Sequence, residues 1–280
     1  MQLLELVERI ERATGLDGVA KALEGLADPP TRVPAVKKLL SGTWLGHRLH
    51  PLLVTVPIGA WTGASVLDLL PGEGRSADAM VALGVAAALP TAASGLSDWV
   101  DTAPREKRVG LVHATANSIA LTCYVASLVA RARGRRRAGR LLALAGLGSV
   151  SVGGYLGGHL SYVQGVGVDR RAFMPFPGDW TPTVHESQIT DGTPHTVTAG
   201  DLPVLLYRED GRLHALAAQC VHAGGPLGAG TVADGCVTCP WHGSTFRLTD
   251  GAVVRAPAAA PQPVLEVRVR EGVVEVRSAG

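Results

Sequence analysis

Cys220-Val-His-Ala-Gly-Gly-Pro-Leu227 and Cys239-Pro-Trp-His-Gly-Ser-Thr-Phe246 are two short segments that each offer one thiol and one imidazole. The stretch from Ala223 to Thr238 separates the inner pair, His222 and Cys239. Two Cys and two His can form a tetrahedral zinc site. Zinc fingers, however, usually pair Cys with Cys and His with His, whereas each segment here has Cys and then His. This order suits an iron cluster in which the two Cys hold one iron and the two His hold the other.

The two segments closely resemble the boxes of the Rieske [2Fe–2S] family, which read C-x-H and C-x-x-H at about this separation. The resemblance covers about the last hundred residues. It implies that Cys220 and Cys239 ligate a buried iron, and that His222 and His242 ligate an outer, more exposed iron. A structural zinc site in the same loops is the alternative.

Neighbouring residues predict how the cluster is tuned. Many Rieske proteins of cytochrome bc complexes have a further Cys in each box, joined as a disulfide, but Gly225 and Trp241 stand there in this chain. The resemblance aligns Ser244 with a serine that hydrogen-bonds a cluster sulfur, and Phe246 with a tyrosine donor. Fewer donors stabilise the reduced cluster less, so we expect a lower or middle Rieske potential, with Ser244 raising it. The cofactor-binding residues expected beside the ligands are Pro240, Trp241, Ser244 and Phe246.

The rest of the chain is unusually apolar. Of its 280 residues only 18% are charged, and the mean hydropathy is +0.21. Residues 51–70, 77–100, 109–130 and 139–163 form apolar runs, each near the ~20 residues that span a bilayer. Small residues recur in them, as membrane helix packing favours. A buried soluble bundle is the competing interpretation. A net charge of +2 without a basic, aromatic patch argues against a nucleic-acid partner.

The first 46 residues predict one or two amphipathic helices rather than a signal peptide. Leu3, Leu6, Val7 and Ile10 fall on one stripe, and Asp28-Pro-Pro is expected to end the helical pattern. We expect this segment to lie on the domain or on the membrane surface.

Ionisable residues gather at one end of the predicted bundle. In an up-down-up-down arrangement, His50, Asp98, His113 and His159 reach the same side of the membrane. They either cap helix ends or form a second site, with haem b or a metal held by the three His and Asp98 as an acceptor for a ring N–H. The His-Pro and Gly-Gly-His motifs resemble those of a little-characterised family of small four-helix bacterial membrane proteins, which implies an architecture but no activity.

The predicted fold is multi-domain α + β. An amphipathic segment (1–46) precedes a four-helix transmembrane domain (47–163), a linker (164–181) and a small antiparallel all-β Rieske domain (182–280). Six Arg between residues 131 and 140 place that loop in the cytoplasm by the positive-inside rule, and the cluster with both termini outside, although the opposite face is also basic.

We therefore expect a multi-pass protein of a bacterial cell membrane whose Rieske domain carries single electrons. The partner would be a redox protein or a quinone. The alternative is a membrane oxidoreductase in which bundle histidines bind haem or metal and exchange electrons with the cluster. A non-redox scaffold with a zinc-filled loop domain is a third possibility.

Overall fold

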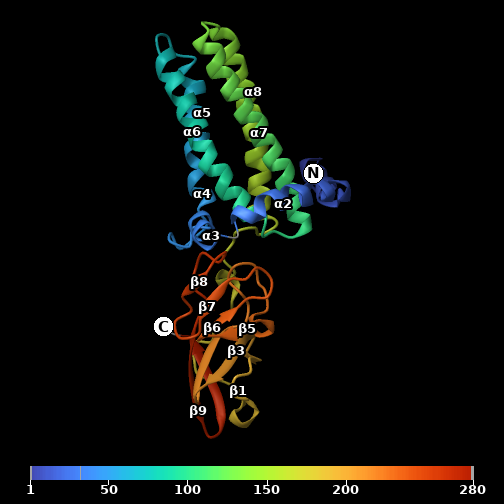
Figure 1. The fold of residues 1–280 in the computed structure, drawn as a ribbon, viewed down its shortest axis with the longest axis vertical. Coiled ribbons are helices and arrows are strands. Elements are labelled where there is room, and N and C mark those ends of the chain that lie inside the picture. Colours follow the sequence, from blue (N-terminus) through green and yellow to red (C-terminus); the bar gives the residue numbers. More distant parts are fainter. Residues whose placement is uncertain (1, 32, 279–280) are drawn as a thin grey trace. The chain divides into compact units, whose positions relative to one another are not determined.

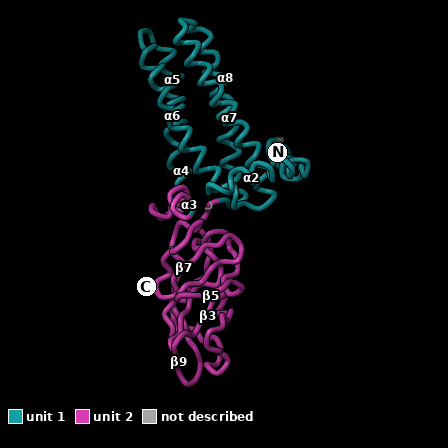
Figure 2. Tube along the Cα trace, viewed as in Figure 1, with its two compact units in different colours: residues 1–33, 49–166 teal, residues 34–48, 167–280 magenta. Residues whose placement is uncertain are grey.

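The computed structural model describes residues 2–31 and 33–278. The chain forms two compact units (Figure 2). The helical unit comprises residues 1–33 and 49–166, and the second unit comprises residues 34–48 and 167–280, with the strands that the described residues form. The fold is thus the expected multi-domain combination of a helical bundle and an antiparallel β domain.

Long apolar helices make up most of the helical unit (Figure 1). Four segments are long and apolar enough to cross a membrane, and only 22–33% of the residues in their apolar windows are buried within the protein. Such exposed apolar surface suits lipid rather than water. The first segment is divided at Val54. The helices are α4 (His50–Leu53), α5 (Thr55–Leu67), α6 (Gly74–Trp99), α7 (Pro104–Ala132) and α8 (Arg136–Tyr162).

The N-terminal helices pack against one end of this bundle. They are α1 (Gln2–Arg12), a 3-10 turn (Thr14–Leu16) and α2 (Asp17–Thr31). On α1, Val7 is buried with Val109 and Leu156, while Leu3 and Leu6 remain more than half exposed. The expected break at Asp28-Pro-Pro is wrong, because α2 continues to Thr31. Both prolines lie in its last turn, where the φ angle that the proline ring fixes is compatible with a helix, and the Thr31 hydroxyl donates to the carbonyl of Asp28 at 3.0 Å.

Short antiparallel strands form three sheets in the second unit, with orders β1-β10-β9, β2-β3-β4 and β5-β6-β7-β8. Asp210-Gly211 and Glu271-Gly272 close two hairpins, because these residues have the positive φ angles that tight two-residue turns require. The strands are β1 (Thr181–His185), β2 (His195–Ala199), β3 (Leu202–Glu209), β4 (Arg212–Ala217), β5 (Thr231–Ala233), β6 (Cys236–Thr238), β7 (Thr245–Arg247), β8 (Val253–Arg255), β9 (Leu265–Arg270) and β10 (Val273–Ser278).

Residues 34–48 belong to the second unit, although they precede the helical bundle in sequence. They comprise α3 (Pro34–Leu40) and the turns that follow it. The Thr43 hydroxyl donates to the carbonyl of Ala258 at 3.0 Å, and both Lys37 and Ser41 are buried. The segment 1–46 is thus divided between the two units, with residues 34–46 in the second.

Candidate metal centre

The two cysteine-containing loops share one backbone design. The first loop follows β4, and the second connects β6 to β7. In each loop the cysteine carbonyl accepts the N–H of the glycine four residues on, at 2.8 Å from Gly224 to Cys220 and at 3.1 Å from Gly243 to Cys239. Both glycines have φ in the left-handed region, +82° and +72°, where a side chain would be strained. The Gly after each pair of ligands is therefore required by the turn.

The two sulfurs are the buried part of the site. Cys220 and Cys239 are 1% and 3% exposed, and all four cysteines of the chain are free thiols. The Cys220 thiol hydrogen-bonds the Cys239 sulfur, which lowers the pKa of Cys239 to about 6 and raises that of Cys220. Backbone N–H groups also point at these sulfurs, from His222 to Cys220 and from Trp241 and His242 to Cys239. Such donors stabilise negative charge on sulfur.

The two imidazoles lie next to each other. The ring centroids of His222 and His242 are 4.9 Å apart at an interplanar angle of 81°, and both side chains are half-buried. Burial lowers the pKa of His222, and the charges of Arg48, His242, Lys37 and Arg170, in decreasing order, lower it further. These cationic residues were not expected near the site, since nothing in the linear sequence links Lys37 or Arg48 to His222.

The residues present fit a binuclear cluster better than a single ion. Within residues 2–31 and 33–278, no three His, Cys, Asp or Glu side chains are placed to hold one metal ion. A structural zinc needs four such ligands, whereas each iron of a Rieske cluster takes only two from the protein. A Cβ at Gly225 would lie 2.8 Å from the sulfur of Cys239, so the glycine lets the two loops approach closely.

The residues expected to tune the cluster occupy different environments. Ser244 is fully buried, and its hydroxyl accepts the N–H of Ala258 at 3.0 Å, which leaves its own hydrogen available for another acceptor. Phe246 is fully buried in β7 within the core. Trp241 is 57% exposed, and Pro240 is also exposed.

Comparisons with known proteins identify both parts of the chain. Residues 179–270 match the Rieske [2Fe-2S] domain, and residues 46–170 match the family described as "Predicted membrane protein (DUF2231)". The anthranilate 1,2-dioxygenase ferredoxin subunit of Burkholderia cepacia is 34% identical over 98 residues, which are 35% of this chain and 91% of that protein. The chain belongs to the Rieske family, and its cofactor is a [2Fe–2S] cluster. It is also a membrane protein, in agreement with its four apolar helices.

Other similar proteins match about a third of the chain. Apoptosis-inducing factor 3 of Mus musculus is 32% identical over 95 residues, which are 34% of this chain. The chain spans only 16% of the length of that relative. Among solved structures, the complex of reduced oxygenase and oxidized ferredoxin in carbazole 1,9a-dioxygenase matches at 31% identity over 35% of this chain and 92% of that chain, with a TM-score of 0.33.

Of the residues expected to form a second site in the bundle, two lie together. The rings of His50 and His113 are 6.5 Å apart between centroids. The Nδ1 of His50 lies 3.0 Å from the carbonyl of Thr91, and that of His113 lies 2.7 Å from the carbonyl of Gly153. Each ring is thus hydrogen-bonded to a backbone carbonyl of a neighbouring helix.

The N-terminal segment engages a third expected member, His159. His159 is buried, and its Nε2 lies 2.9 Å from the Oε1 of Glu11 on α1. Arg105 and Gln164 also donate to the Glu11 carboxylate. Asp98 is half-buried in the last turn of α6. His159 therefore has a structural partner that the amphipathic pattern of the N-terminal segment did not reveal.

Proposed function

We propose that this protein is a membrane-anchored Rieske electron carrier in which Cys220 and Cys239 hold the buried iron, and His222 and His242 hold the outer iron. The observation that supports this most is the donor set, with two touching thiols in the interior and two adjacent imidazoles beside them. The cluster would supply reversible uptake of one electron.

The surrounding residues would prepare the site for this role. Backbone N–H groups of His222, Trp241 and His242 point at the cysteine sulfurs and offset the negative charge there. The Ser244 hydroxyl is held in place by Ala258 and can donate a further hydrogen bond. The half-buried imidazole edges are the part of the site through which an electron would reach a partner.

The partner we propose is another redox protein. One Rieske relative is named as the ferredoxin subunit of a dioxygenase, which is an enzyme with more than one component. The membrane domain would hold the same kind of carrier at a bacterial cell membrane. Quinone is a further candidate donor. Six Arg between residues 131 and 140 support a cytoplasmic position for that loop, and hence an extracytoplasmic Rieske domain. Labelling of single introduced cysteines in intact cells tests this sidedness.

A membrane oxidoreductase is the second candidate, and the His50–His113 pair is the observation that favours it. Hydrogen bonding of Nδ1 to a carbonyl is how proteins orient histidines that bind metal through Nε2. The Nε2 of His113 lies 3.2 Å from the side-chain amide nitrogen of Asn117, so metal binding there would displace this amide. Because Glu11 engages His159, a haem or metal here would rely on His50 and His113.

Purification of the full-length protein in detergent distinguishes the candidates. An electron carrier shows two irons and two sulfides per chain and a Rieske-type electron-spin signal on reduction. A haem Soret band that disappears in His113→Ala and persists in His159→Ala would favour the second candidate. Stoichiometric zinc without sulfide would refute both.

A further inference from the structure

We propose that residues 34–48, here called the basic cap, lie over the cluster-binding end of the Rieske unit and that Lys37 and Arg48 raise the reduction potential of the cluster. This inference rests on the proposed electron-carrier function. The basic cap lies outside the region that matches the Rieske family, which begins at residue 179. The ferredoxin subunit from Burkholderia cepacia is matched over 91% of its length by 98 residues of this chain.

The basic cap is attached close to the cluster loops. The Thr43 hydroxyl donates to the carbonyl of Ala258, whose N–H donates in turn to the Ser244 hydroxyl in the second loop. Arg48 packs beside Gly167, where an added Cβ would lie 3.5 Å from the Arg48 Cγ. Two hydrogen bonds therefore link the basic cap, through Ala258, to Ser244, which follows His242 and Gly243 in the second loop.

Positive charge is concentrated at this end of the unit. Lys37 is 8% exposed, and Arg48 is half-buried. Arg170 is held against the first loop, because its N–H donates to the carbonyl of Val221 at 3.2 Å. The charges of Lys37, Arg48 and Arg170 all act on His222. His222 is an imidazole that is expected to ligate the outer iron.

The direction of the effect follows from charge. Reduction adds one negative charge to the cluster, and nearby cations stabilise that state more than the oxidised one. Burial weakens solvent screening, so Lys37 acts more strongly than an exposed lysine would. We expect the loss of both cap charges to reduce the equilibrium constant for reduction by about tenfold, which is about 59 mV for one electron.

The experiment uses full-length Lys37→Gln, Arg48→Gln and the variant that combines both changes. Lys38→Gln is the control, because it removes an exposed charge from the same helix. The potential is measured by a redox titration followed by the Rieske spin signal. The double variant should show the full shift, Lys38→Gln almost none, and Lys37→Arg should restore the Lys37 contribution. If the variants keep a normal spin signal and the double variant has the same potential as Lys38→Gln, the proposed effect of the basic cap is wrong and the electron-carrier function stands. Absence of the signal from the unaltered protein overturns the proposed function as well.

A separate observation concerns the bundle, whose second hairpin repeats the contacts of the first. His113, Tyr124 and Arg131 follow His50, Trp61 and Asp68 at the same sequence separation in all three pairs, and the members of each pair lie against each other. Trp61 and Tyr124 are stacked at 4.2 Å with an interplanar angle of 8°. The two hairpins therefore contact each other at three levels, and the three contacting residues have the same spacing in each hairpin.

The partner helices repeat in the same way, again at a constant sequence separation. Trp61 packs over Gly84 and Tyr124 over Gly146, while His50 packs over Gly95 and His113 over Gly157. Buried positions on α6 also recur on α8: Ala77, Val81, Gly84, Thr91, Ser94 and Ser97 correspond to Gly139, Ala143, Gly146, Gly153, Leu156 and His159. We infer that the bundle consists of two copies of one helical hairpin, residues 50–99 and 113–162, related by an approximate two-fold axis along the helices.

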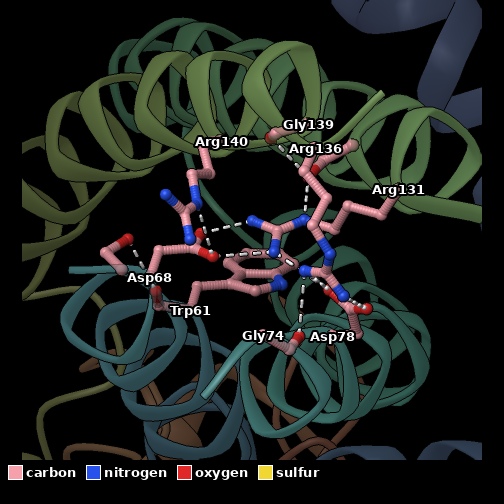
Figure 3. A network of polar contacts seen from close by, with 10 residues as sticks. Trp61, Asp68, Gly74, Asp78, Arg131, Arg136, Gly139 and Arg140 are labelled. Atoms are coloured by element: carbon pink, nitrogen blue, oxygen red, sulfur yellow. Dashed lines mark hydrogen bonds and ion pairs between the residues drawn. The ribbon is translucent and has the colours of Figure 1, made fainter. Parts of the chain in front are cut away.

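The two copies differ in charge where they meet near the α5–α6 and α7–α8 turns (Figure 3). The first carries Asp68 and Asp78, and the equivalent positions of the second are Arg131 and Arg140. Arg131 pairs with Asp68 and, at 3.0 Å, with Asp78, while Arg140 lies 3.4 Å from Asp68. Arg136 adds a bond to Asp78 at 2.8 Å.

Complementary charge gives the repeat a pairing rule. Two identical hairpins would place like charges together in an apolar setting, which is strongly unfavourable. An acidic and a basic copy attract each other and exclude pairing with their own kind. The Asp–Arg network therefore directs the first hairpin onto the second, rather than onto the same hairpin of another chain.

Exchange of the charges in the full-length protein tests this rule. Asp68→Arg alone should reduce the yield of monodisperse protein in detergent by at least about tenfold. Exchange of all four residues, with Asp68 and Asp78 changed to Arg and Arg131 and Arg140 changed to Asp, should recover most of it. The exchange keeps the net charge of this membrane face, so topology is controlled. Recovery no better than that of Asp68→Arg would overturn the pairing rule.

Discussion

Ser244→Ala is expected to change both the potential and the stability of the Rieske unit, by separate routes. The fully buried hydroxyl accepts the N–H of Ala258 at 3.0 Å and retains a hydrogen for a cluster sulfur. A hydrogen bond that is stronger in the reduced state by about 1–1.4 kcal/mol corresponds to about 40–60 mV for one electron, and the potential should fall by that amount. Loss of the acceptor leaves the Ala258 N–H buried and unpaired, which should cost about 1–3 kcal/mol of unfolding free energy.

The two effects are measured on the same preparation, the potential by a spin-monitored titration and the stability by denaturant unfolding. Thr245→Val is the matched control, because it removes the adjacent hydroxyl, which bonds Thr238 at 3.0 Å. It should leave the potential unchanged. A Ser244→Ala protein that is less stable but has an unaltered potential would show that the serine serves only Ala258.

Three further changes test other parts of the structure. Cys239→Ala should abolish the cluster and loosen both loops, and retention of a Rieske-type spin signal would contradict the ligand assignment. His242→Cys adds a negative ligand, so the potential should fall, as a redox titration of the variant would show. The pKa of Glu11 is lowered, because hydrogen bonds from His159 and Arg105 outweigh the opposite effect of burial. The carboxylate therefore stabilises the fold above its ordinary pKa of 4.5, and this contribution is lost as the pH falls below that value. Glu11→Gln should lower the melting temperature at neutral pH and flatten its acid dependence.

The cluster loops could be predicted from the sequence because their chemistry is local. All four expected ligands fall within the single segment from Cys220 to His242, and the glycines that shape the loops lie between or beside them. The membrane helices could also be predicted, because the length and apolarity of each segment are properties of that segment alone. The hairpin turns at Asp210-Gly211 and Glu271-Gly272 follow from residue types that tolerate positive φ.

Contacts between distant residues could not be predicted in this way. Glu11 and His159 are 148 residues apart, and the amphipathic pattern of α1 gives no indication of a buried acceptor for a bundle histidine. The basic cap lies before the bundle in sequence, yet it packs with strands that follow the bundle. The hairpin repeat is also hidden, because few residue identities survive between the copies and the equivalent positions are recognised by their contacts.

Two Cys and two His of this membrane protein are proposed to hold a [2Fe–2S] cluster that carries single electrons. The most direct test is iron and sulfide analysis of the full-length protein in detergent, combined with electron-spin spectroscopy of the reduced sample labelled with ¹⁵N-histidine. Two irons and two sulfides per chain are expected, with a Rieske-type signal whose coupling to two histidine nitrogens weakens in His222→Ala and His242→Ala. A signal without histidine coupling, or zinc in place of iron, would contradict the proposed ligand set.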